Sequence, residues 1–162
     1  MKGWLLGTDL GYRDTDWVTR AAYGLVAVLG PVPSRSHTAA HGFRDSAGRP
    51  LSGENRYTLT FDFGDLPPVT EFWEIPLYDQ EGYFVDNPIN RYSINSYMLK
   101  QSTLRAEGGK VTIFIQNGEP KDANQRKNWL PAPASGGFNS RRAGPGTPLI
   151  DGSYNMPGVV RV

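Results

Sequence analysis

The stretch Lys110-Val111-Thr112-Ile113-Phe114-Ile115-Gln116 decides the fold class of this chain. It is rich in β-branched and aromatic side chains, and both of its faces are partly apolar. Such residues suit the pleated, half-buried surface of a sheet, so the stretch predicts a β-strand. Because apolar residues occupy both faces, we expect this strand to be central and to close on the core.

Working outward, a second strand is predicted over residues 57–63, where apolar and polar residues alternate. Tyr57, Leu59, Phe61 and Phe63 fall on one face of it. Alternation with a period of two is typical of a strand with one buried face. This segment therefore predicts a half-buried strand.

Further strands are expected at residues 37–44, at 70–78 and, as short pieces, within 136–162. The turn-forming sequences Asp45-Ser46-Ala47-Gly48 and Asp79-Gln80-Glu81-Gly82 separate neighbouring strands. Pro76 has no N–H to donate, which favours an edge strand or a bulge at that position.

One helical pattern lies in residues 14–29. Asp14, Thr15 or Asp16 can cap its start, and a Gly-Pro pair ends it at residues 30–31. Apolar residues recur there at spacings of three and four, which predicts an amphipathic helix with its stripe packed on a sheet: Trp17, Val18, Ala21, Ala22, Leu25, Val26 and Leu29.

Length and composition favour one β-rich domain. A chain of 162 residues buries roughly two thirds of its unfolded surface as a single unit. Its 19 glycines and 13 prolines match many short strands joined by tight turns. We therefore predict a single domain over residues 1–162. We expect it to be mainly β, an antiparallel β-sandwich of jelly-roll type, with the helix of residues 14–29 packed on one sheet.

Charge and hydropathy exclude several partners. Seventeen basic and sixteen acidic residues give a net charge of +1, so no long-range field favours nucleic acid or an anionic membrane. No apolar run approaches the roughly 18 residues of a membrane span, and Trp4-Leu5-Leu6 is too short for a signal-peptide core. The sequence thus predicts a soluble protein and leaves its compartment unassigned.

Most familiar catalytic motifs are missing. The absence of cysteine excludes disulfides, thiolate catalysis and cysteine-based metal sites. Neither a Gly-x-Ser-x-Gly elbow nor a Ser-x-x-Lys motif is present, although a Ser-His-Asp triad is defined by geometry and stays open. No glycine-rich phosphate loop follows a strand, so no nucleotide cofactor is predicted.

The two histidines do not predict a metal site. His37 and His41 follow prolines and are expected in an extended segment, which sets them roughly 13 Å apart. On a helix the same spacing would suit zinc. We interpret them as ordinary surface or turn residues, and no cofactor or metal is expected.

Three signature segments carry the candidate binding residues: Phe72-Trp73-Glu74-Ile75-Pro76-Leu77-Tyr78-Asp79, Asn87-Pro88-Ile89-Asn90-Arg91-Tyr92-Ser93 and Asn128-Trp129-Leu130-Pro131-Ala132-Pro133. The third lies in a polar, proline-rich stretch from 117 to 133, longer than most loops, and it predicts a rigid segment that is neither helix nor strand.

A binding wall for a small polar or carbohydrate-like ligand is the first hypothesis. Trp73, Tyr92 and Trp129 would supply aromatic faces, and Asn90, Arg91 and Asn128 directional polar groups. Each residue also has a structural interpretation. Arg91 can hold its loop to Asp86 or Glu74, and Trp129 can cap the core. Arg141 and Arg142 fit either an anion clamp or a solvated sheet edge.

Two other functions stay open. Glu74 and Asp62 lie on faces of predicted strands and would form a hydrolase or lyase site if their carboxyls were roughly 5–10 Å apart, with Arg91 stabilising negative charge. Carboxylates on strand faces are more commonly solvated or paired with arginine. A structural role is the third possibility, in which exposed edges or residues 117–133 mediate homo-oligomerisation.

In this order, the signature segments resemble the bacterial and viral domain-of-unknown-function family 1214, together with Asp151-Gly152 and Pro157 near the end. The likeness spans roughly residues 10–162. It implies a jelly-roll-like β-sandwich with a peripheral helix, in proteins that are frequently exported, and it brings no accepted catalytic set. Members often form the C-terminal half of longer proteins whose first half belongs to family 1254.

Two positions depart from the family pattern. Glu74 stands where a small hydroxyl residue is usual, and Arg142-Ala143 stands in place of a Leu-Tyr pair. If these positions line a pocket, its polarity differs in this chain.

Overall fold

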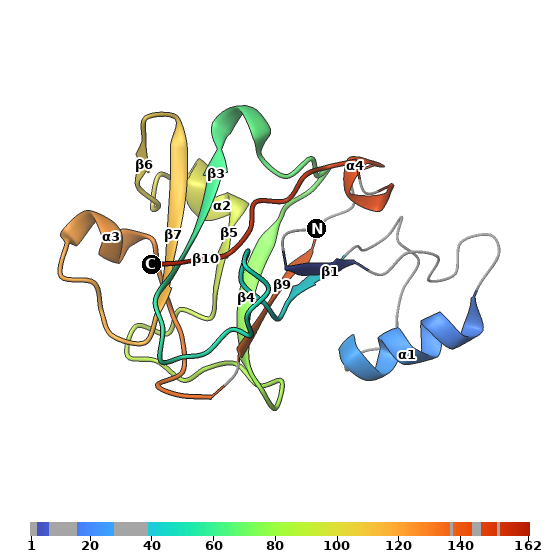
Figure 1. The fold of residues 1–162 in the computed structure, drawn as a ribbon. Helices are drawn as coiled ribbons and strands as arrows, with labels where there is room; N and C mark the ends of the chain where they lie inside the picture. The colour runs from blue at the N-terminus through green and yellow to red at the C-terminus, as the bar shows by residue number, and fades with distance from the viewer. Residues whose placement is uncertain (1–2, 7–15, 28–38, 137, 144–146, 152) are drawn as a thin grey trace.

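A computed structural model describes residues 3–6, 16–27, 39–136, 138–143, 147–151 and 153–162. Over these residues the chain is mainly β, as predicted, with two sheets of five strands each and a few short helices (Figure 1). The first sheet has the order β1 (Trp4–Leu6), β2 (Ala39–Gly42), β9 (Phe138–Ala143), β4 (Glu74–Asp79) and β5 (Ser93–Asn95). All of its pairings are antiparallel.

The second sheet is built around β7 (Lys110–Gln116), whose bounds are those predicted. On one edge β7 pairs with β3 (Tyr57–Asp62), which in turn pairs with β10 (Val160–Arg161). On its other edge, β6 (Ala106–Glu107) covers the start of β7 and β8 (Trp129–Pro131) covers its end. The expectation of a central strand is confirmed.

Side chains from both sheets form one hydrophobic cluster. Alternation along β3 and β7 directs every second residue inward, and the same cluster takes in residues of β4 and β5. Its fully buried members include Leu59, Phe61, Ile75, Leu77, Ile94, Ile113 and Ile115. The shared cluster ties the two sheets together.

The helices are short and lie between strands. They are α1 (Trp17–Ala27), the 3-10 turn η1 (Phe63–Asp65), α2 (Ser96–Lys100), α3 (Ala123–Lys127) and α4 (Thr147–Ile150). Of the helices in the described part of the chain, none has the length and apolar character that crossing a bilayer requires.

The predicted packing of α1 on a sheet is not observed. The helix lies inside the predicted range of 14–29, and Asp16 caps it by accepting from the N–H groups of Val18 and Thr19. However, Trp17 is 73% exposed and Leu25 is 85% exposed, and Figure 1 shows α1 away from both sheets. An apolar stripe predicts that a face is suited to burial, but not which surface covers it.

Pro76 does not mark an edge or a bulge. Its strand, β4, lies between β9 and β5, and Pro76 pairs with Ser93 of β5. The β4–β9 pairing joins Glu74 to Ala143 and resumes at Leu77, with the same register on both sides. The missing N–H is thus accommodated by a gap in the β4–β9 pairing and not by an inserted residue.

The prediction that residues 128–133 avoid regular structure is also wrong. Trp129–Pro131 forms β8, which runs parallel to β7 with Ile115 opposite Leu130. A proline fits there because it ends an edge strand, and the N–H of Ala132 donates to the carbonyl of Gln116 instead.

The predicted turn after β2 forms around Asp45. The Oδ1 atom of Asp45 accepts from the N–H groups of Ala47 and Arg49, each at 2.9 Å, and Oδ2 pairs with Arg49 Nε at 2.8 Å. Asp45 is only 1% exposed. Burial by itself raises the pKa of this carboxyl, but the hydrogen bonds from Arg49 and Ala47 outweigh it and hold the pKa below the usual value of 3.8.

The depressed pKa of Asp45 predicts a stability loss in acid. A group whose folded pKa lies below its unfolded value contributes fully above the unfolded value and loses that contribution as pH falls through the folded pKa. We therefore expect Asp45→Asn to destabilise the protein most at neutral pH, and the deficit to shrink below about pH 4. Urea unfolding across this range measures it. A deficit independent of pH would contradict the charge-based explanation.

Candidate binding site

Arg91 fixes the end of α3. Its Nη1 atom donates to the carbonyls of Lys127 at 3.0 Å and Trp129 at 2.9 Å, with a longer contact to Arg126 at 3.3 Å. Partial burial lowers the pKa of Arg91, but a guanidinium remains charged in proteins. No ion pair joins it to a carboxylate of the described residues, so neither Asp86 nor Glu74 is its partner. Arg91 is a structural clamp that acts on carbonyls.

The loop that carries Arg91 is itself held by a buried amide. Asn87 Oδ1 accepts from the N–H of Arg91 at 2.9 Å, and Asn87 Nδ2 donates to the carbonyls of Arg91 and Val85, both at 3.0 Å. The start of α3 is fixed by Asp122, whose Oδ1 accepts from the N–H groups of Asn124 and Gln125. Both ends of this short helix are therefore anchored.

Asn128 completes the edge of β7 between β6 and β8. Its side-chain oxygen accepts from Arg105 N at 2.7 Å, and its Nδ2 donates to the carbonyls of Arg105 at 2.7 Å and Thr112 at 2.8 Å. Its own carbonyl accepts from Phe114 N at 3.0 Å. The side-chain amide takes the place of a peptide group where no strand covers β7. Asn128 is buried, as this role requires.

Trp73 and Trp129, the two tryptophans predicted to contact a ligand, are core residues. Trp129 is 3% exposed, and its Nε1 donates to Gln116 O at 2.8 Å. Trp73 is 2% exposed and stacks on Phe61 of the other sheet, with ring centroids 5.6 Å apart. Neither ring presents a free face to a ligand. The burial of Trp129 supports its structural interpretation, in which the ring caps the core.

Tyr92 belongs to a row of aromatic rings, and Asn90 is bonded to it. The Phe84 ring stacks on Tyr78 at 4.9 Å and contacts Tyr92 at 5.5 Å, and the Tyr92 hydroxyl donates to Asn90 Oδ1 at 3.3 Å. Asn90 has a φ of 50°, which an asparagine tolerates better than most residues. The contacts among these rings brace the β4–β5 connection, although Phe84 itself is 52% exposed.

The structure gives the proposed pair of carboxylates no common site. Asp62 lies on β3 and pairs with Lys110 at 3.5 Å, whereas Glu74 lies on β4 in the other sheet and accepts from Ser93 Oγ at 2.6 Å. Each carboxylate thus has its own partner. Neither partner is the arginine that the structural interpretation named, since Asp62 pairs with a lysine and Glu74 with a serine.

The prediction that the histidines are surface or turn residues is wrong for His41. His41 lies on β2, extended as expected, but it is buried rather than a surface or turn residue, and its ring lies 6.0 Å from Phe43. His37 falls outside the described residues, as do the side chains of Arg141 and Arg142 on β9. Among the described residues, no three histidines or carboxylates are grouped to hold a metal.

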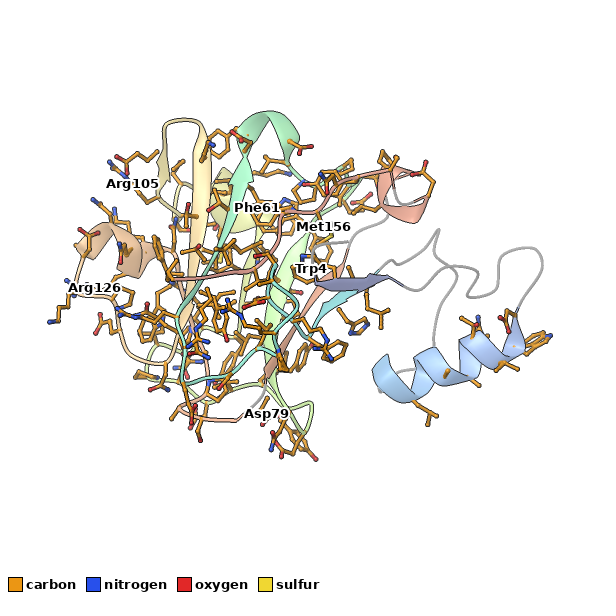
Figure 2. The ribbon with its side chains drawn as sticks, viewed as in Figure 1. Trp4, Phe61, Asp79, Arg105, Arg126 and Met156 are labelled. Carbon is orange, nitrogen blue, oxygen red and sulfur yellow. The ribbon has the colours of Figure 1, made fainter. Side chains whose placement is uncertain are left out.

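A hollow lies where β6, β7 and α3 meet, with a volume of about 290 Å³. Its charged lining residues are Arg105, Glu107, Lys110 and Asp122, and its amide residues are Asn124, Gln125 and Asn128. The outward-facing Thr112 and Phe114 of β7 complete it. Figure 2 shows Arg105 and Arg126 at the same side of the molecule, away from Phe61.

Of the predicted binding residues, Asn128 lines this hollow and Arg91 supports its α3 wall. Sequence reasoning missed the remaining lining residues. The period of two along β7 was a usable signal, since it places Lys110, Thr112 and Phe114 together on the face opposite the buried one. No comparable signal existed for Gln125, because its position depends on how α3 packs.

A family model identifies the family of this chain, and solved structures share its fold. Residues 36–142 match the family model described as Protein of unknown function (DUF1214). No curated protein matches the chain. The crystal structure of the VPA0106 protein from Vibrio parahaemolyticus is 25% identical, with a TM-score of 0.69, and the match covers 89% of this chain and 35% of that one.

A second solved structure shares the fold. It is that of an uncharacterized protein from Burkholderia cenocepacia, with 16% identity and a TM-score of 0.51, and the match covers 83% of this chain and 31% of that one. The chain thus spans about a third of the length of both solved proteins.

Proposed function

Because this chain belongs to the DUF1214 family, whose function is unknown, we propose a function from its own geometry: the domain binds a small polar or carbohydrate-like molecule in the hollow beside α3. One observation carries the proposal. Charged and amide side chains, together with Phe114, line a hollow of about 290 Å³, close to the lower end of the volumes that small-molecule sites have.

The lining chemistry suits a ligand with several hydroxyl or amide groups. Gln125 and Asn124 each offer a donor and an acceptor, and neither side chain has a hydrogen bond within the described part of the chain. Phe114 is partly buried and adds apolar surface for the carbon skeleton. Directional polar groups beside one ring are the usual means of orienting such a molecule.

The predicted binding residues take a supporting part in this proposal. Asn128 already makes three side-chain hydrogen bonds and fixes the base of the hollow, and Arg91 holds its α3 wall. Ligand contacts fall instead to Gln125, Asn124 and Arg105. A membrane or nucleic-acid partner is not part of the proposal, and self-association stays a prediction.

The finer description of the fold belongs to the same proposal. We infer that residues 1–162 form one domain and that the two sheets face each other as a β-sandwich. The contact between Phe61 of β3 and Trp73 beside β4, together with the shared core cluster, supports this arrangement. The jelly-roll topology stays a prediction.

Binding in the hollow is testable with Gln125→Ala. Loss of one ligand hydrogen bond is expected to weaken binding about tenfold. Titration of a panel of monosaccharides and small polar acids, followed by amide chemical shifts, measures the affinity and locates the site. Gln101→Ala changes an exposed glutamine outside the hollow and serves as the matched control. Shifts that map elsewhere, or no shifts at all, would contradict the proposal.

A further inference from the structure

We infer that the ligand of the hollow is a zwitterion, a small molecule that carries both a carboxylate and an ammonium group, such as a free amino acid. This inference rests on the proposed function and narrows it to one chemical class. It is based on which charged side chains of the lining are paired within the protein and which are not.

Arg105 provides a positive charge that no side chain of the described residues neutralises. Both of its backbone polar groups are bonded to the Asn128 side chain at 2.7 Å, so its Cα position is well defined. Its guanidinium has no hydrogen bond or ion pair with any side chain that the structure describes. The other lining cation, Lys110, is paired with Asp62 at 3.5 Å. Arg105 is therefore the group available to a ligand carboxylate, which a guanidinium can bind in a bidentate manner.

Glu107 provides the matching negative charge. It ends β6, two residues after Arg105, and both residues line the hollow. Yet no ion pair forms between them. The other lining acid, Asp122, has Oδ1 occupied by two N–H groups of α3. Glu107 is thus available to a ligand ammonium group.

Two unpaired opposite charges favour a ligand that satisfies both. The lining holds two cationic and two anionic residues, so the hollow has no net charge that would select a polyanion or a polycation. A neutral sugar would leave both Arg105 and Glu107 without an ionic partner. A zwitterion places its carboxylate at the first and its ammonium at the second, with its side chain against Phe114.

Leucine and two derivatives test the inference. N-acetylleucine lacks the ammonium group, and leucinamide lacks the carboxylate, so the three compounds share one skeleton. We expect leucine to bind at least about tenfold more tightly than either derivative and than glucose, as the loss of one charge-assisted contact implies. Calorimetric titration at low salt measures the affinities, because higher salt weakens exposed charge pairs.

Variants that each remove one charge test whether Arg105 contacts the ligand carboxylate and whether Glu107 contacts the ligand ammonium group. Arg105→Gln should abolish the preference for leucine over leucinamide, and Glu107→Gln should abolish the preference over N-acetylleucine. Arg105→Lys should retain part of the first preference and guards against a folding defect in Arg105→Gln. Arg161→Gln and Glu54→Gln make the same charge changes at exposed sites outside the hollow and should leave all preferences unchanged.

Other outcomes separate the inference from the proposed function. Binding of glucose in the hollow as tight as that of leucine, unaffected by Arg105→Gln, would overturn the zwitterion and leave the binding function standing. Failure of every compound in the wider ligand panel to shift the hollow's amides would overturn both.

Discussion

Replacing Asn128 by alanine is expected to lower the free energy of unfolding by about 3 kcal/mol. The side chain makes three partly buried hydrogen bonds to the backbone between β6 and β8, and alanine leaves the N–H of Arg105 and the carbonyls of Arg105 and Thr112 without these partners. Each unsatisfied buried group costs about 1–3 kcal/mol, so the loss exceeds that of an ordinary polar substitution. The effect is large because one amide replaces a missing stretch of strand.

Urea unfolding followed by tryptophan fluorescence measures this loss. Asn155→Ala removes an exposed asparagine and should change the free energy of unfolding by less than about 0.5 kcal/mol. Asn128→Asp should cost at least as much as the alanine variant, because a carboxylate faces two carbonyl oxygens that previously accepted hydrogen bonds. A stable Asn128→Asp protein would contradict the proposed role of the amide N–H groups.

Replacing Trp73 by alanine is expected to cost about 4 kcal/mol of unfolding free energy, a typical loss for a buried large aromatic residue. The ring is 2% exposed and stacks on Phe61 of the other sheet. The backbone of Trp73 is also bonded to Ser96, whose N–H donates to its carbonyl at 3.0 Å. Truncation therefore opens a cavity at a contact between the two sheets.

The matched control for this cavity is Trp17→Ala. Trp17 is 73% exposed, so its loss should leave the unfolding midpoint nearly unchanged. Trp73→Phe should recover much of the loss, since it refills part of the volume. If Trp73→Ala kept its stability but lost ligand binding, the residue would belong to a binding site after all.

The strands could be predicted where local sequence decides them. β7 has its predicted bounds because β-branched residues run through it, and the turn at Asp45 forms because its side chain bonds to backbone within four residues. The alternation of Tyr57, Leu59 and Phe61 likewise predicted the buried face of β3. Phe63, expected on the same face, instead begins η1 and is 44% exposed. In these elements, the decisive interactions and patterns involve residues that are close together in the sequence.

The candidate site could not be predicted in the same way. Arg91 binds carbonyls 35 to 38 residues further along the chain, and a backbone acceptor leaves no trace in side-chain identity. The proline content of residues 128–133 suggested a loop, but the unpaired edge of β7 gave Trp129–Pro131 a partner and made it a strand. Which strand lies next to which is a property of the tertiary fold.

The pairing of β1 with β2 has a consequence for how the sequence of this fold can vary. Leu6 lies opposite Ala40, so the chain leaves the first sheet and returns to it at neighbouring Cα positions about 5 Å apart. Whatever lies between them meets the same anchor points whether it is long or short, and loop-closure entropy grows only slowly with length. A foreign peptide inserted between β1 and β2 is therefore expected to cost the sheets little stability.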